Sequence, residues 1–352
     1  MQPSCGRPVI TWIINRHNRL MVGVSDKAPD GGRNMTDAPC CGVCLLIVLS
    51  IFSFTSAAGD ELGYEFAYTS NRIEGQTGIY LHTKDGEQLL SAAFTVAEAP
   101  SWSPDGKKMT FQTQVDDRWD IYVMDVAGRN PRPLTSDAPG DFHPVWSPDG
   151  STIAFYSDRS IPARVWLIES DGTSLREFPI EITGIADFSW SPDGRQVVFC
   201  ANERVTDPDA PRPEFGTDVK KDVYIASSDG NNLRRITKTG SMAMSPAWSP
   251  NGKQIAFALT TKPGNLSEIH IHVVNLDGTG FTKLTNDPGQ NVCPKWSPDS
   301  SGVLFYNQPP SSDKSTPRLV YVSTDGGRKA VVDVGKSGGY FPDVRSQSPT
   351  KR

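Results

Sequence analysis

Trp146-Ser147-Pro148-Asp149-Gly150 is the most informative stretch of the sequence, because the same five residues recur along the chain. Exact copies begin at Trp102 and Trp190, and near copies begin at Trp248 and Trp296. Successive tryptophans of this motif are 44, 44, 58 and 48 residues apart. A period of about 40 to 50 residues is typical of repeat proteins in which every repeat is one supersecondary unit.

The motif has the chemistry of a tight hairpin turn. Proline presets φ at the first corner, aspartate suits the second, and glycine accepts the left-handed conformation that closes the turn. β-rich runs follow each motif, for example Ile153–Tyr156. A second turn, centred on a glycine, follows these runs in six places: Gly86, Gly128, Gly172, Gly230, Gly278 and Gly326. The pattern predicts six copies of a unit with four antiparallel strands of about five residues each.

Six such units predict an all-β fold, a six-bladed β-propeller. A lone four-stranded sheet has two apolar faces, and a radial arrangement buries both of them. We expect the repeated tryptophans to pack between blades and not to stack on a ligand. The first copy lacks the tryptophan motif, and Tyr340–Val344 resembles Phe142–Trp146. The C-terminal stretch is therefore predicted to supply the first strand of the first blade and to close the ring.

The N-terminal part of the chain lies outside this repeat. Residues 1–34 are polar and without periodicity, and Met35 is an alternative start. Residues 41–54 are almost continuously apolar and are followed by the small residues 55–58, so residues 35–58 are predicted to be a signal peptide. An uncleaved membrane anchor is the alternative. With cleavage, the propeller spans residues 59–346, a disordered tail follows at 347–352, and the protein is periplasmic or secreted.

Charge and cysteine content limit the function further. The net charge of −5 offers no basic surface for nucleic acid. Signal cleavage would leave Cys200 and Cys293, which lie at different strand positions of different repeats. We expect two separate thiols. No cofactor is predicted, and the protein is expected to be a monomer that is not integral to the membrane.

The repeated elements together resemble the TolB family of propellers over about residues 64–346. The resemblance rests on the tryptophan motif, on the strand Ile121–Asp125 and on the Leu-Thr ending at Leu134-Thr135. It implies a periplasmic protein of the Tol–Pal envelope system, whose propeller binds the peptidoglycan-associated lipoprotein at the mouth of its channel. TolB also carries an α/β domain ahead of its propeller. Only Gly59–Gly63 separate the predicted cleavage site from the first strand, so the sequence predicts a TolB-like propeller without that domain.

Three segments carry weaker chemical signals. Gly335–Gly339 matches the nucleophile-elbow pattern around Ser337, but 13 residues follow it and no histidine follows His272, so a glycine-rich approach to the closing strand is favoured. His270 and His272 share one face of a strand, and a pair on the polar face of a blade is favoured over a zinc site. Residues 203–221 form an insertion whose candidate calcium ligands are Asp207, Asp209 and Asp218; a solvated insertion is favoured.

Strand direction predicts where binding occurs. Both kinds of tight turn share one face, which we call the turn face, and the longer connections share the other, the loop face. We expect the binding residues on the loop face, around the channel mouth: Asp141, Phe142, His143, Asp187, Met242, Met244, Tyr340 and Phe341. Phe142, His143, Tyr340 and Phe341 are the best candidates, because they are predicted to lie just ahead of innermost strands. Aromatic and methionine side chains are common on partner-binding surfaces.

The predicted function is a module that binds a protein or cell-envelope partner. One alternative is an enzyme that acts on polysaccharide or peptide within the channel. Another is a regulatory propeller that has lost its hydrolase domain. Several histidine, aspartate or glutamate side chains converging on one point would favour an enzyme, whereas a lining of mixed small and apolar side chains would favour binding.

Overall fold

The computed structural model describes residues 62–137, 140–160, 163–180, 182, 185–202, 220–262, 265–313, 315–332 and 340–345, together with two short strands near the N-terminus. The chain divides into two compact units, residues 1–55 and 56–352. In the first unit β1 (Trp12–Ile14) pairs antiparallel with β2 (Leu20–Val22). The predicted signal peptide, the C-terminal tail, Ser337 and the aspartates of the 203–219 segment lie outside the described residues.

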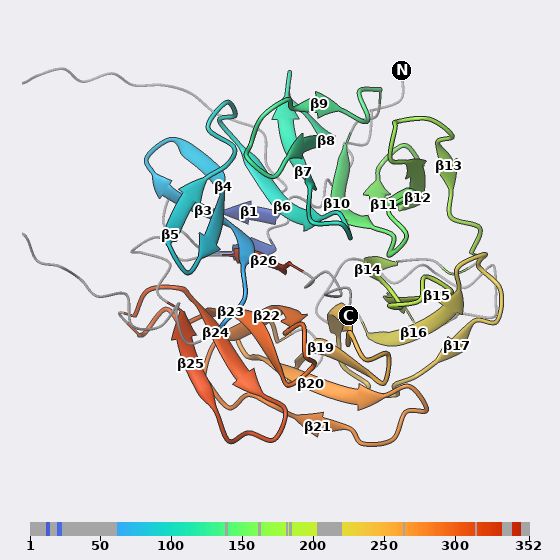
Figure 1. Cartoon of the computed structure of the whole chain (residues 1–352). Coiled ribbons are helices and arrows are strands. Elements are labelled where there is room, and N and C mark those ends of the chain that lie inside the picture. The colour runs from blue at the N-terminus through green and yellow to red at the C-terminus, as the bar shows by residue number, and fades with distance from the viewer. Residues whose placement is uncertain are drawn as a thin grey trace, which may run out of the picture. The chain divides into compact units, whose positions relative to one another are not determined.

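The described residues of the second unit form strands and turns without a helix, and their sheets succeed one another in chain order (Figure 1). None of the described residues belongs to a helix that could span a membrane.

Each sheet has four antiparallel strands, and we number the sheets in chain order. Sheet 1 contains β26 (Tyr340–Val344), β3 (Phe66–Ile73), β4 (Gln76–Thr83) and β5 (Gly86–Leu89). Sheet 2 contains β6 (Ala97–Trp102), β7 (Lys108–Val115), β8 (Arg118–Asp125) and β9 (Arg132–Pro133). Sheet 3 contains β10 (Asp141–Trp146), β11 (Thr152–Ser157), β12 (Arg164–Glu169) and β13 (Arg176–Glu177).

The remaining strands continue the pattern. Sheet 4 contains β14 (Ala186–Trp190), β15 (Gln196–Asn202), β16 (Lys221–Ser227) and β17 (Arg234–Arg235). Sheet 5 contains β18 (Ala243–Trp248), β19 (Gln254–Thr260), β20 (Ile269–Asn275) and β21 (Thr282–Lys283). Sheet 6 contains β22 (Gln290–Trp296), β23 (Gly302–Gln308), β24 (Arg318–Ser323) and β25 (Lys329–Val332).

At four junctions within the described residues, a backbone bridge links the third strand of one sheet to the first strand of the next. Sheets 5 and 6 are joined into one hydrogen-bonded sheet by a single parallel bridge, Ile269↔Gln290. Equivalent isolated bridges link three other pairs of sheets: Thr77↔Val96, Trp119↔Gly140 and Lys221↔Met242. The same backbone contact therefore recurs at the loop-face end of these junctions.

The tryptophan motif forms the predicted turn. In sheet 3 the Ser147 hydroxyl donates to Asp149 (2.6 Å) and accepts the Thr152 amide (2.9 Å). Gly150 has φ of 74°, the left-handed conformation that the turn requires. Four of the five motif tryptophans are buried, namely Trp102, Trp146, Trp248 and Trp296. Trp190 is partly buried against the core. The prediction that these tryptophans are core residues is confirmed.

The fourth strands are shorter than the predicted five residues. β9, β13, β17 and β21 have two residues each, whereas β5 and β25 have four. A fourth strand is paired on one side only, and short strands at a sheet edge limit pairing with other chains.

The C-terminal strand β26 pairs antiparallel with β3, as the sequence predicts. The side chain of Asp343 also accepts the Trp102 amide (2.8 Å), which ties β26 to sheet 2. The first strands contact one another in succession, in the order β26, β6, β10, β14, β18 and β22, and β22 contacts β26.

Candidate binding site

The first strand of each sheet contains one non-glycine residue with positive φ, at or next to the point where its pairing with the second strand shifts register. These residues, which we call the bulge residues, are Ala99 (φ 50°), His143 (53°), Asp187 (56°), Ser245 (49°), Cys293 (55°) and Phe341 (48°). A β-bulge leaves one residue unpaired and redirects its side chain. Left-handed backbone at a non-glycine residue costs of order 1–3 kcal/mol and is concentrated at functional sites.

The bulge residues of different sheets contact one another. Asp187 accepts the backbone amide of Ser245 (2.7 Å). The Ser245 side chain and the Phe341 backbone act on the Cys293 thiol and oppose the rise of its pKa. The Phe341 ring meets the edge of the His143 ring at 5.2 Å, although their strands β26 and β10 belong to sheets that are not consecutive. The side chains of five sheets therefore converge on one place.

The electrostatics of this place favour neutral side chains. Burial lowers the pKa of His143, and the charge of Asp187 opposes that shift. Burial, reinforced by the same charge, raises the pKa of Cys293 to about 12. Near neutral pH His143 is therefore an uncharged imidazole and Cys293 a protonated thiol. The six bulge residues combine small, polar and aromatic side chains.

A buried polar link supports the bulge of sheet 3. Gln112 accepts the His143 amide through Oε1 (2.8 Å) and donates through Nε2 to Glu98 (3.2 Å). Burial raises the pKa of Glu98 to about 7, and the hydrogen bond from Gln112 acts in the opposite direction.

Four residues at the bulges were not predicted as site residues from the sequence: Glu98, Gln112, Ser245 and Cys293. A proline follows the bulge residue in five of the six first strands, and this signal could have identified Ser245 and Cys293.

The predicted binding residues fall into two groups. Phe142, His143, Asp187, Met242 and Phe341 are partly exposed, whereas three others, Asp141, Met244 and Tyr340, are buried.

The prediction that the four best candidates lie just ahead of innermost strands was wrong. All eight predicted binding residues except Met242 lie within first strands. The reason is that pairing resumes on both sides of the bulge, so the strand begins several residues earlier than the turn pattern indicates.

Asp141 has a structural partner. Its Oδ2 accepts Arg159 at 2.8 Å, and Arg159 also lies 3.5 Å from Asp137. Burial of Arg159 is assisted by its position over the Trp166 ring (5.0 Å).

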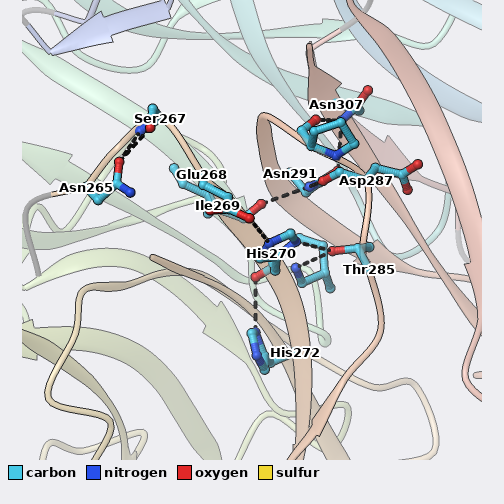
Figure 2. Close-up of polar contacts among 12 residues, drawn as sticks. Asn265, Ser267, Glu268, Ile269, His270, His272, Thr285, Asp287, Asn291 and Asn307 are labelled. Atoms are coloured by element: carbon cyan, nitrogen blue, oxygen red, sulfur yellow. Dashed lines mark hydrogen bonds and ion pairs between the residues drawn. The ribbon is translucent and has the colours of Figure 1, made fainter. Parts of the chain in front are cut away.

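His270 and His272 are buried, with 1% and 8% of their surface exposed, so their placement on a polar face was wrong. Figure 2 shows His270 between Glu268 (3.2 Å) and Thr285 (3.4 Å), with His272 turned to the His270 carbonyl (3.2 Å). Burial lowers the pKa of His272 to about 4. The face is buried because sheet 5 packs against sheet 4. Phe257 and Leu259, which pair with His272 and His270, belong to one core cluster with Val198 and Val223 of sheet 4.

Within the described ranges, no three histidine, cysteine, aspartate or glutamate side chains are placed to hold a metal ion. Cys200 in β15 and Cys293 in β22 are separate thiols, as the repeat register predicts.

The family model for the TolB beta propeller domain matches residues 55–208 and 214–347. The chain belongs to this family. Among solved structures, TolB from Acinetobacter baumannii is similar with a TM-score of 0.65 and 17% identity, over 81% of this chain and 67% of that one. A protein assigned as TolB from Agrobacterium tumefaciens is similar with a TM-score of 0.58 and 20% identity, over 77% of this chain and 88% of that one.

A puromycin-hydrolyzing peptidase from Mycobacterium tuberculosis has a TM-score of 0.51 and 16% identity, over 78% of this chain and 46% of that one. At these identities the likenesses establish the fold alone. No curated protein sequence matches the chain.

Proposed function

We propose that this TolB-type propeller binds a protein partner at its loop face and does not act as an enzyme. The observation that carries the proposal is the set of side chains left partly exposed at the bulges. Phe142, His143, Asp187 and Phe341 lie at or next to the bulges of three first strands and stay partly exposed. Large aromatic side chains near the centre of a contact supply most of the energy of many protein interfaces.

The turn face lacks this freedom, because its aspartates are engaged in their own turns. Asp171 accepts both the amide (2.9 Å) and the hydroxyl (2.6 Å) of Thr173. Asp229 accepts the amide of Asn231 (3.0 Å) in the same way. These hydrogen bonds lower the pKa of both carboxyls. Side chains fixed by backbone geometry are poorly placed to adapt to a partner.

The ionisation of the bulge residues supports binding over nucleophilic catalysis. A catalytic cysteine needs a lowered pKa and a neighbouring base. Cys293 has a raised pKa, and the groups that oppose the rise are Ser245, Lys295 and the Phe341 backbone. An enzyme acting on polysaccharide or peptide in the channel, or a regulatory propeller that has lost its hydrolase domain, would depend on other groups.

The mapping is tested by capture from envelope extract. Phe142→Ala with Phe341→Ala should weaken capture at least tenfold while the melting temperature stays within a few degrees. Tyr340 is left unchanged because its burial makes it a core residue. The matched control is Asp171→Lys with Asp229→Lys on the turn face, which should leave capture intact. Loss of capture in the control pair alone would reverse the assignment of faces.

We further propose that the sheets are six blades of one closed ring. The pairing of β26 with β3 and the succession of contacts among first strands support this arrangement. Ending the chain at Gly339 removes β26 and exposes the interior of sheet 1. That truncation should lower the melting temperature by about 10 °C or more, whereas removing residues 347–352 should change it little. Equal melting temperatures would refute the closure.

We propose that the protein is periplasmic or secreted and that it is a monomer. Membership of the TolB beta propeller family and the apolar segment at residues 41–54 support it. N-terminal sequencing of secreted material should find Gly59 as the first residue. Recovery of the uncleaved chain in a membrane pellet would contradict signal cleavage.

A further inference from the structure

The junction of sheets 2 and 3 holds more negative than positive charge. Asp120 and Asp141 have 2% and 0% of their surface exposed, and Asp137 and Asp158 lie around them. Arg159 pairs with Asp141 and Asp137. Among the described residues, the Oδ1 atoms of Asp120 and Asp141 are buried without a hydrogen-bond partner. Buried oxygens without a donor create a negative potential that attracts a further positive group.

The pKa directions agree with this geometry. Burial raises the pKa of Asp120, and the charges of Asp141 and Asp137 add to the shift while Arg118 opposes it. Burial also raises the pKa of Asp158, with Asp141 again adding to the shift. In the described part of the chain, Asp158 makes no ion pair.

Directly beside these carboxylates, the Phe142 ring and the Asp158 carboxylate lie against the backbone of Gly140. A Cβ added to Gly140 would lie 2.5 Å from the Phe142 ring and 3.4 Å from Asp158 Oδ2. Trp119 forms a backbone bridge to Gly140, and its ring centre is 6.0 Å from that of Phe142. Trp119, Phe142 and Asp158 are all partly exposed. A ligand at this surface would meet two aromatic rings and a carboxylate together.

This combination suits an organic cation. Lysine and arginine side chains are attracted to the faces of aromatic rings, and arginine also forms paired hydrogen bonds with carboxylates. A metal ion fits less well, because the described residues provide no three-ligand group. We propose that Trp119, Phe142 and Asp158 form a receptor for a lysine or arginine side chain of the protein partner. The inference rests on the proposed function and specifies the chemistry of the partner.

The test is a titration of the full chain, labelled with ¹⁵N, with the peptide acetyl-Gly-Arg-Gly-amide. The indole N–H signal of Trp119 should shift saturably. The same peptide with uncharged citrulline in place of arginine should bind at least about fivefold more weakly, and so should arginine peptide added to Asp158→Asn. Asp229→Asn, on the turn face, is the matched control and should bind the arginine peptide as the unmodified chain does.

Two results would overturn the proposal. One is equal binding of the arginine and citrulline peptides, or undiminished binding by Asp158→Asn. The other is a Trp119 shift produced by calcium chloride but not by the arginine peptide, which would indicate a metal site.

Failure of the receptor and failure of the proposed function can be told apart, because the titration needs no envelope partner. If capture is lost in the single variant Phe341→Ala but no arginine peptide binds, the receptor fails and the proposed function stands. If the peptide binds but Phe142→Ala with Phe341→Ala keeps full capture, the proposed function fails.

Discussion

Asp120 in sheet 2 and Asp222 in sheet 4 occupy the same position of two repeats but have opposite surroundings. Each is buried in the third strand of its sheet. Asp222 accepts hydrogen bonds from Arg235 (2.6 Å), the Thr237 hydroxyl (2.9 Å) and the Thr239 amide (2.9 Å). Among the residues that the structure describes, the Oδ1 atom of Asp120 has no hydrogen-bond partner. One carboxylate therefore joins its third strand to the segment that follows, and the other is a surplus charge.

The difference arises from two substitutions in the segment around the fourth strand. Pro133 stands in sheet 2 where Arg235 stands in sheet 4, and Asp137 stands where Thr239 stands. Proline has no N–H and no side-chain donor, and Asp137 brings a second negative charge. A repeated aspartate is thus either a structural link or a buried surplus charge, depending on what the segment around the fourth strand supplies.

Replacement of Asp222 should have the largest effect. Asp222→Ala removes the carboxylate that pairs with Arg235 and that accepts the hydrogen bond of the buried Thr237 hydroxyl. The free energy of unfolding should therefore fall by about 3–5 kcal/mol. Urea denaturation measures this loss. A loss below about 1 kcal/mol would mean that the hydrogen bonds around Asp222 contribute little, and the contrast between the sheets would disappear.

Neutralising Asp120 should act in the opposite direction. The raised pKa of Asp120 means that the folded state holds a proton that the unfolded state releases at lower pH. Stability from this group is therefore present below about pH 4, near the unfolded pKa, and is lost as pH rises through the folded pKa. Asp120→Asn should gain about 1 kcal/mol at pH 8 and nothing below pH 4. Melting curves from pH 4 to pH 8 measure the effect, with Asp222→Asn as a control variant that should be destabilised. If Asp120→Asn were less stable than the unmodified chain at pH 8, the charge of Asp120 would not be in surplus.

The threonines that follow the two short fourth strands offer a third comparison between the two sheets. Thr237 accepts the Val223 amide (3.0 Å) and donates to Asp222, whereas Thr135 accepts the Ile121 amide (3.0 Å). Valine at either position leaves a buried amide unpaired. Thr237→Val should therefore cost about 2 kcal/mol and Thr135→Val about 1 kcal/mol. Equal costs would show that the Thr237–Asp222 hydrogen bond adds no stability.

Much of the architecture was predictable because it depends on residues close together in the chain. Ser147, Asp149 and Gly150 form their turn among themselves, so five letters are enough to predict it. The register of the repeat then places Trp146 in the core and Cys200 apart from Cys293. The pairing of Tyr340–Val344 with the first repeat followed from the same register, because the last copy resembles the start of the others.

The site depends on contacts between repeats, which local patterns do not contain. His143 meets Phe341 across nearly 200 residues of chain, and only the redirection of each first strand at its bulge brings the two rings together. His270 was expected on a polar face and is buried, because the neighbouring sheet covers it. Turns and strands follow from steric preferences of adjacent residues and could be predicted from the sequence. Burial and pKa at Asp120, Asp222 and His270 follow from which side chains the next strand or sheet brings within a few ångströms, and these were settled by tertiary packing.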